Sequence, residues 1–180
     1  MGQQKSETVV PKAIVGNYPS NFQRYVDQVK EDDLQTAFKN QMPAAEFFLE
    51  SISEELSKRK YADDKWTIKE VLQHMIDAER IFCYRALCFA RKEERPLHSF
   101  NENEYAVNSN GNDRPWAELI AEFSAVRKST EYLYNSFSPE AVNSIGKASD
   151  YTMGVSTLGF VIVGHVNHHI RIIQERYIGV

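Results

Sequence analysis

The sequence predicts an all-α protein: a four-helix bundle with long connections between helices two and three and between helices three and four, preceded by an N-terminal arm. Two observations carry this prediction. Four segments repeat apolar side chains at steps of three and four residues, the spacing of an amphipathic helix. The alternation of apolar and polar residues that is typical of strands is absent. We expect residues 1–33 to form the arm, packed on the bundle, and residues 34–180 to form a single bundle domain.

The first helix follows an extended segment that ends in a short helical turn containing Phe22 and Tyr25. Pro43 lies within the first helix. We expect a kink or a break there, because proline lacks a backbone N–H and clashes with the preceding turn. The apolar stripe of this helix consists of Leu34, Phe38, Met42, Ala45, Leu49, Ile52 and Leu56.

The second helix begins at a capping box, in which Thr67 is the N-cap and the side chain of Glu70 reaches back to it. Its helical pattern continues to about Arg91. The polar connection that follows, residues 92–114, is far longer than the loops that usually join neighbouring antiparallel helices. A connection of this length either crosses the bundle, so that helices two and three run parallel, or covers an active site.

The third helix is predicted to start at Pro115, because proline is favoured at the first helical position. Its apolar stripe ends at Phe137, and a second long loop follows. The fourth helix is predicted over residues 157–178, with Ser156 or Thr157 as its N-cap and Gly179 closing it.

Composition excludes several classes of protein. Lys and Arg number 21 against 25 Asp and Glu, a net charge of −4 without a basic block, so we expect no nucleic-acid partner. No run of 18 apolar residues is present, so no membrane span is expected. Cys83 and Cys88 do not form a C-x-x-C motif and are typical of small core residues in a reducing compartment. We therefore expect a cytoplasmic protein.

Three histidines fall on predicted buried faces: His165 and His169 one turn apart on helix four, and His74 on helix two. Protonating neighbouring imidazoles in an apolar site is unfavourable, whereas a divalent metal accepts a lone pair from each ring. Three protein ligands with an open position are typical of catalytic metal sites. A packed, hydrogen-bonded histidine cluster is the alternative. His168, at the edge of the same face, is a candidate supporting residue around the site.

Other residues near the predicted histidine face are candidates for functional roles, and each also has a purely structural explanation. Asp77 lies close to His74 and either orients a ligand ring or pairs with a neighbouring arginine. Arg85 either binds an anionic substrate or pairs with a glutamate. In the long connection, Glu102 and Glu104 are candidate general bases and Tyr105 is a candidate substrate contact. The alternative is that this charged loop is only solvated.

Two segments resemble the DinB/YfiT-like superfamily of metal-binding four-helix bundles. They are W-T-I-K-E-V-L-Q-H-M-I-D-A-E-R, from Trp66 to Arg80, and G-H-V-N-H-H-I-R-I-I, from Gly164 to Ile173. The resemblance covers nearly the whole chain. It implies a divalent metal held by one histidine of helix two and an H-x-x-x-H pair of helix four. Matched position by position, these ligands are His74, His165 and His169.

The resemblance also implies a function, because similar proteins include transferases and isomerases that use low-molecular-weight thiols. We therefore expect a metal-dependent enzyme, with Zn²⁺, Ni²⁺ or Fe²⁺ by ligand type, that activates a thiol or water against a small-molecule substrate. Thiol transfer ranks ahead of hydrolysis on the resemblance alone. A homodimer is expected. The alternatives are a non-catalytic bundle with a structural metal and an interaction module that uses aromatic side chains of the arm.

Overall fold

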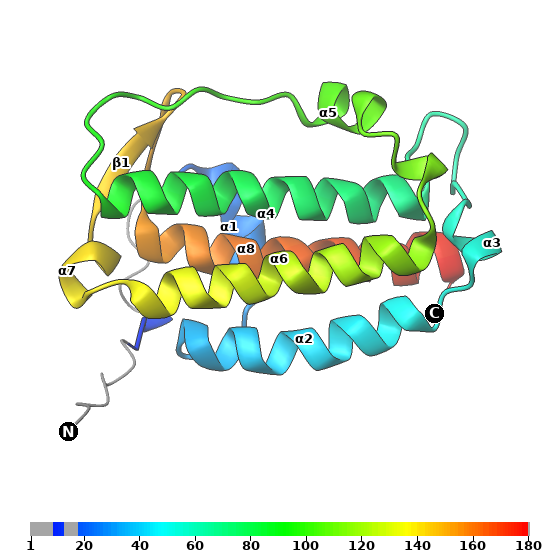
Figure 1. Ribbon diagram of the computed structural model, residues 1–180, viewed down its shortest axis with the longest axis horizontal. Helices are drawn as coiled ribbons and strands as arrows, with labels where there is room; N and C mark the ends of the chain where they lie inside the picture. Colours follow the sequence, from blue (N-terminus) through cyan, green and yellow to red (C-terminus); the bar gives the residue numbers. More distant parts are fainter. Residues whose placement is uncertain (1–8, 13–17, 180) are drawn as a thin grey trace.

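The computed structural model describes residues 9–12 and 18–179, so most of the predicted arm before residue 18 lies outside the described residues. Four long helices form the bundle, as predicted (Figure 1): α2 (Leu34–Glu50), α4 (Ile68–Ala90), α6 (Trp116–Ser136) and α8 (Val155–Ile172). None of the described helices is both long enough and apolar enough to cross a membrane.

The connection between α4 and α6 crosses the full length of the bundle, so these two helices run parallel and α2 and α8 run opposite to them (Figure 1). This confirms the first of the two interpretations of the long connection. The connection contains two short helices, α5 (Glu102–Asn108) and η2 (Gly111–Asp113). Because α5 lies alongside α4, the connection also covers one side of the bundle.

Helix α2 differs in extent from the predicted first helix. A break at Pro43 is wrong, because α2 continues through this residue and ends at Glu50. Of the predicted stripe beyond Glu50, Ile52 lies in the link after α2 and Leu56 in a separate turn, α3 (Glu54–Ser57). The N-cap of α3, Ser53, accepts a hydrogen bond from the Leu56 amide. The N-cap of α2 is Asp33, which accepts one from the Thr36 amide.

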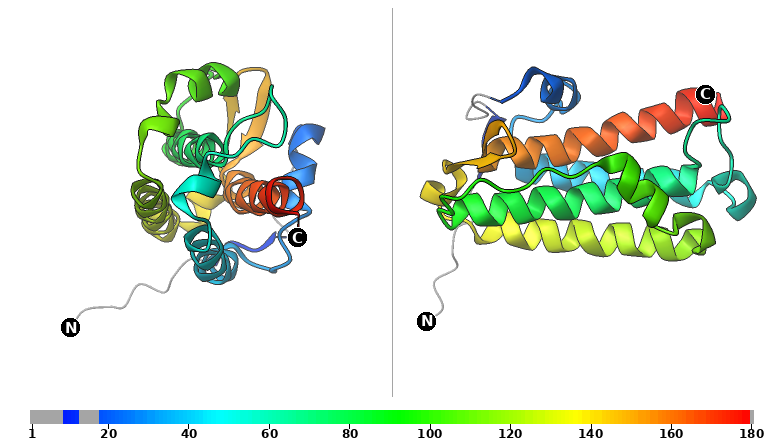
Figure 2. Two further views of the ribbon diagram at one scale, coloured as in Figure 1. Left: turned by 90° about the vertical axis from the view of Figure 1, so that its right-hand side faces the viewer. Right: turned by 90° about the horizontal axis from the view of Figure 1, so that it is seen from above.

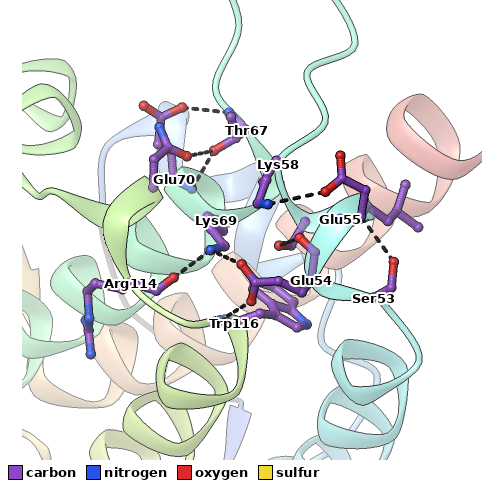
Figure 3. Close-up of polar contacts among 12 residues, drawn as sticks. Ser53, Glu54, Glu55, Lys58, Thr67, Lys69, Glu70, Arg114 and Trp116 are labelled. Atoms are coloured by element: carbon purple, nitrogen blue, oxygen red, sulfur yellow. Dashed lines mark hydrogen bonds and ion pairs between the residues drawn. The ribbon is translucent and has the colours of Figure 1, made fainter.

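Helix α4 starts at the predicted capping box (Figure 3). The Thr67 hydroxyl accepts a hydrogen bond from the Glu70 amide at 3.1 Å, and the Glu70 carboxylate accepts one from the Thr67 amide at 2.7 Å. These two bonds satisfy donors that a helix start otherwise leaves free. The predicted cap is confirmed, and it fixes where the helix that carries His74 begins.

A buried lysine ties the start of α4 to its neighbours (Figure 3). Lys69 is 2 % exposed, and its ammonium group contacts the Glu54 carboxylate and donates to the Arg114 carbonyl oxygen at 2.6 Å. Glu54 also accepts a hydrogen bond from the Trp116 amide at 2.7 Å. Since these residues come from α3, α4 and the start of α6, the cluster holds three elements together at this end of the bundle.

The connection between α6 and α8 holds the main departure from the predicted all-helical chain. It contains a helical turn, α7 (Pro139–Val142), and a hairpin of two antiparallel strands, β1 (Ile145–Ala148) and β2 (Tyr151–Gly154). Strands of four residues are too short to produce a visible alternation pattern, which is why the sequence did not reveal them. The hairpin lies near the end of α4, where an isolated bridge joins Leu97 to Ala148.

The ends of α8 agree only in part with the prediction. A cap at Ser156 or Thr157 is wrong, because β2 leads directly into the helix at Val155 and Gly154 is the N-cap without a side-chain bond. The last turns are a π-helix, η3 (Ile173–Ile178). Gly179 closes them with a φ of 83°, in the left-handed region that glycine adopts without strain, as predicted.

A short helix outside the bundle, α1 (Ser20–Val26), lies beside α8 (Figure 2). Its buried side chains include Phe22 and Tyr25. The two helices approach so closely that a Cβ atom at Gly164 would lie 1.9 Å from the Tyr25 carbonyl oxygen. A glycine at this position therefore permits α1 to pack against α8.

The core has two apolar clusters, one toward each end of the bundle, and a polar network lies between them. Glu79 of α4 and Arg127 of α6 form a two-bond ion pair, with distances of 2.8 and 2.9 Å. Arg127 also donates to the Gln41 side chain of α2 at 2.5 Å, and Gln41 donates to the Val163 carbonyl and the Asn167 side chain of α8. We call these residues the buried network; it links all four helices.

Candidate metal centre

Three imidazole rings meet where α4 packs against α8. His165 and His169 project from consecutive turns of α8, and His74 faces them from α4. The Nε2 atom of His165 lies 3.0 Å from the Nε2 atom of His74 and 3.0 Å from that of His169. Candidate ligand atoms of all three rings lie within 4.8 Å of one another. The helix pairing therefore brings together the three histidines that the sequence singled out.

The two 3.0 Å spacings at the Nε2 atom of His165 are close to those of neighbouring ligand atoms on one divalent ion. Two ligand atoms that each lie about 2.1 Å from one ion are about 3.0 Å apart at a right angle and about 3.4 Å apart at the tetrahedral angle. Hydrogen bonding alone fits less well, because a neutral ring nitrogen carries either one hydrogen or one lone pair. The Nε2 atom of His165 can therefore match only one of its two neighbours, whereas an ion would accept a lone pair from each ring.

The surroundings keep these rings neutral. Burial lowers the pKa of His74 to about 4, and the negative charge of Glu102 opposes this shift. Burial is also the main cause that lowers the pKa of His165 and of His169 well below the usual value for histidine. A neutral imidazole is the form that binds metals, so the low pKa values leave lone pairs available at neutral pH.

Aromatic side chains hold the imidazole rings in place. The ring centroids of Trp66 and His74 are 5.0 Å apart. Tyr25, from α1 outside the bundle, packs edge-on against both His165 and His168, at 5.2 and 5.4 Å. These contacts restrict the rotation of the rings, which favours a preformed site.

The three histidines line a cavity of about 480 Å³. The residues that line the cavity come from across the chain: from α1, α4, the long connection, the hairpin and α8. Six aromatic residues contribute to its walls, and its charged side chains are Arg24, Arg85 and Glu102. The aromatic residues that line it are Phe22, Tyr25, Trp66, Phe82, Phe100 and Tyr151.

The structure separates the two glutamates proposed as general bases. Glu102, the first residue of α5, lines the cavity, and its charge acts on His74. Glu104 does not line this cavity; its carboxylate accepts a hydrogen bond from the Asn101 side chain at 3.0 Å. Tyr105 also lies outside the cavity, with its ring 5.3 Å from the ring of Phe100.

The other predicted residues are also divided between the cavity and its surroundings. Arg85 and His168 line the cavity. Asp77 instead accepts a hydrogen bond from Gln73 at 3.0 Å and pairs with Arg80 at 3.9 Å, outside the cavity. The sequence did not point to Arg24 or Tyr151 as cavity residues. Both lie outside the four helices of the bundle, Arg24 in α1 and Tyr151 in β2.

Comparisons with known proteins agree with the fold. YfiT from Bacillus subtilis, described as a probable metal-dependent hydrolase with an unusual four-helix bundle topology, has a similar fold. The match has a TM-score of 0.68 and 14 % sequence identity, and it covers 89 % of this chain and 87 % of that protein. A sequence search of curated proteins gave no significant match. The family model of the DinB superfamily matches residues 21–173, which include all three histidines. The chain therefore belongs to the DinB superfamily.

Proposed function

We propose that this protein is a metal-dependent enzyme that hydrolyses a small molecule, with His74, His165 and His169 holding a divalent ion. The observation that carries the proposal is that the three ligand nitrogens converge in the wall of a cavity. Structural metal sites are closed by four protein ligands, whereas catalytic sites use three and leave a position for water or substrate. Three histidines beside a cavity match the second pattern.

The ligand set narrows the choice of metal. Neutral imidazole nitrogens suit Zn²⁺, Ni²⁺ and Fe²⁺, and no carboxylate joins the three histidines in the part of the chain that the structure describes. An ion bound there would polarise a substrate carbonyl and lower the pKa of water or of a thiol.

Glu102 is the residue best placed to move a proton. It lies at the start of α5, lines the cavity and acts electrostatically on His74. We infer that its carboxylate accepts the proton of the attacking nucleophile and returns it to the leaving group. The aromatic walls reduce the space for bulk water and orient the substrate.

Transfer to a low-molecular-weight thiol is the second candidate. The sequence resemblance favours it, whereas the description of YfiT as a probable hydrolase favours water as the nucleophile. Neither Cys83 nor Cys88 lines the cavity, so a thiol would have to enter as a second substrate.

Metal content tests the site directly. Protein purified without added metal should contain about one equivalent of zinc, nickel or iron by elemental analysis. His165→Ala should lose this metal and keep its helical circular dichroism. His98→Ala is the matched control, because His98 is exposed and outside the cavity. The absence of metal from the wild type, even after reconstitution, would refute the proposal.

Activity tests the role of Glu102. The metal-loaded protein should hydrolyse members of a panel of small esters and amides, and a panel of electrophiles with added thiol tests the second candidate. Glu102→Gln should lower turnover by about 10²–10⁴-fold with its metal content unchanged. Glu104→Gln, two residues away on the same helix and outside the cavity, is the matched control. Equal effects of the two variants would contradict the assignment.

A further inference from the structure

One charged side chain of the cavity, Arg85, is buried without an ion-pair partner among the described residues. Arg85 of α4 is 7 % exposed and lines the cavity. Its guanidinium group makes one hydrogen bond, from Nη2 to the His98 carbonyl oxygen at 3.1 Å, and lies 5.8 Å from the centre of the Phe100 ring. A guanidinium has five N–H donors, so most of its capacity is unused within the described residues.

A comparison with Arg127 shows how unusual the unpaired guanidinium of Arg85 is. Arg127 is also buried, and Glu79 and Gln41 bind it from two sides. For Arg85, no carboxylate lies within 4.0 Å in the described part of the chain; Glu93, the nearby acid, binds Arg95 through both oxygens. A buried charge without a partner is unfavourable, and burial lowers the pKa of Arg85. A protein tolerates such a group where a ligand supplies the missing charge.

The rest of the cavity indicates what kind of ligand this is. The other arginine, Arg24, is exposed and donates to the Tyr25 hydroxyl at 2.9 Å. Counted without the ion that the histidines would hold, Arg24, Arg85 and Glu102 give the cavity a net charge of +1, which a single carboxylate balances. Phe100 lies beside Arg85, and Phe82 is a further aromatic residue of the cavity lining. Such walls bind apolar or ring-containing groups.

We propose that the substrate is a monocarboxylate with an apolar or aromatic body, and that Arg85 binds its carboxylate while the body packs on the aromatic walls. This inference rests on the proposed function, because it places the reacting part of the substrate toward the three histidines. The planar guanidinium matches the two oxygens of a carboxylate, and Arg85 would determine both the orientation and the specificity of binding.

The test uses benzoate as the probe, with benzamide as its neutral counterpart, in isothermal titration calorimetry of the whole protein. Benzoate should bind the wild type in both its metal-free and its zinc-loaded form, and benzamide should bind about 10-fold or more weakly. Arg85→Met, which keeps the apolar stem, should weaken benzoate binding by about 10- to 100-fold. Arg80→Met is the control, because Arg80 lies on the same helix, outside the cavity, and pairs with Glu122.

Stability separates a binding role from a structural one. Without ligand, Arg85→Met should unfold at a temperature no lower than the wild type, because the variant loses an unpaired buried charge. A clear loss of stability would overturn the proposal, as would equal binding of benzoate and benzamide to the wild type, a result that does not depend on any variant. Tighter binding of phenyl phosphate than of benzoate would overturn the carboxylate class.

Metal analysis of the same samples keeps the two proposals apart. Benzoate binding that requires zinc and is unchanged in Arg85→Met would mean that the carboxylate is a metal ligand; this would overturn the role of Arg85 and leave the metal site intact. Arg85-dependent binding to a protein that never takes up metal would support the inference about Arg85 and refute the proposed function.

Discussion

The interior of the bundle contains two polar clusters that are built in opposite ways. In the buried network, the Arg127 and Glu79 side chains are 1 and 2 % exposed and satisfy each other and Gln41 through short bonds. In the histidine cluster, three neutral rings point nitrogens at one another beside a cavity. The first cluster is complete within the protein. In the second, the Nε2 atom of His165 faces two other ring nitrogens and can match only one of them, which is the gap that the proposed metal would fill.

The largest loss of stability should come from removing one charged partner of the buried network. Arg127→Met removes the partner of Glu79 and leaves a buried carboxylate unpaired, which should reduce the free energy of unfolding by about 3–5 kcal/mol. Urea denaturation followed by circular dichroism measures this loss. The double variant Glu79→Leu/Arg127→Met should recover most of the lost stability, because no unpaired charge remains. If Arg127→Met were as stable as the wild type, the buried network would contribute nothing to the stability of the fold.

The histidine cluster should respond to metal and tolerate its removal. At a free metal concentration about 100 times the dissociation constant, binding should add about 2.7 kcal/mol to the free energy of unfolding. A chelator should therefore lower the melting temperature moderately and leave the bundle folded, since both apolar clusters remain. His165→Ala should show no response to the chelator. Complete unfolding on chelation would instead indicate a structural metal, the alternative kept open from the sequence.

The sequence revealed one of these clusters and not the other, for a physical reason. Histidines on an apolar helix face are conspicuous because they combine metal-binding chemistry with a buried position. Glu79 and Arg127 occupy the same kind of position, since Glu79 lies four residues after Met75 and Arg127 four after Phe123, both of which are buried. Each of the two helices therefore carries a charged residue within its apolar stripe, and this pattern could have predicted an ion pair across the core.

The cavity was harder to predict than the helices, because its walls come from the connections. On an α-helix, residues two positions apart point about 200° apart, so only one of Glu102 and Glu104 can face the cavity. The sequence could name both and could not choose between them before α5 was placed on the bundle. The hairpin that contributes Tyr151 was missed for a related reason, since four-residue strands have no distinctive pattern.

A third prediction tests how far the cavity depends on α1, which lies outside the four helices. Gly164→Ala places a methyl group against the Tyr25 backbone, a clash that can be relieved only if α1 moves. We expect a loss of about 1–3 kcal/mol in the free energy of unfolding. Because Tyr25 packs on His165 and His168, metal affinity should fall as well.

Gly111→Ala is the matched control for this prediction. A Cβ atom there would lie 3.3 Å from the Cβ atom of Gln73, outside the cavity, a contact that a shift of a few tenths of an ångström relieves. The control should keep the metal affinity of the wild type in a competition assay with a zinc chelator. An unchanged metal affinity in Gly164→Ala would show that α1 does not support the histidine cluster.

The smallest expected effect again concerns the buried network. It tests how much a single hydroxyl group, that of Thr130, contributes to the stability of this network. The Thr130 hydroxyl donates to the Glu79 carboxylate at 2.7 Å, and the Cys83 sulfur lies 3.1 Å from the Thr130 hydroxyl oxygen. Thr130→Val removes this bond while Arg127 still satisfies Glu79, so the free energy of unfolding should fall by only about 1 kcal/mol. Thr130→Ser keeps the hydroxyl and should lose less. Metal content should be unchanged in both variants, because Thr130 does not line the cavity. If Thr130→Val instead lowered the metal content, the buried network and the histidine cluster would be coupled through α4. The buried network could then no longer be regarded as a purely structural cluster.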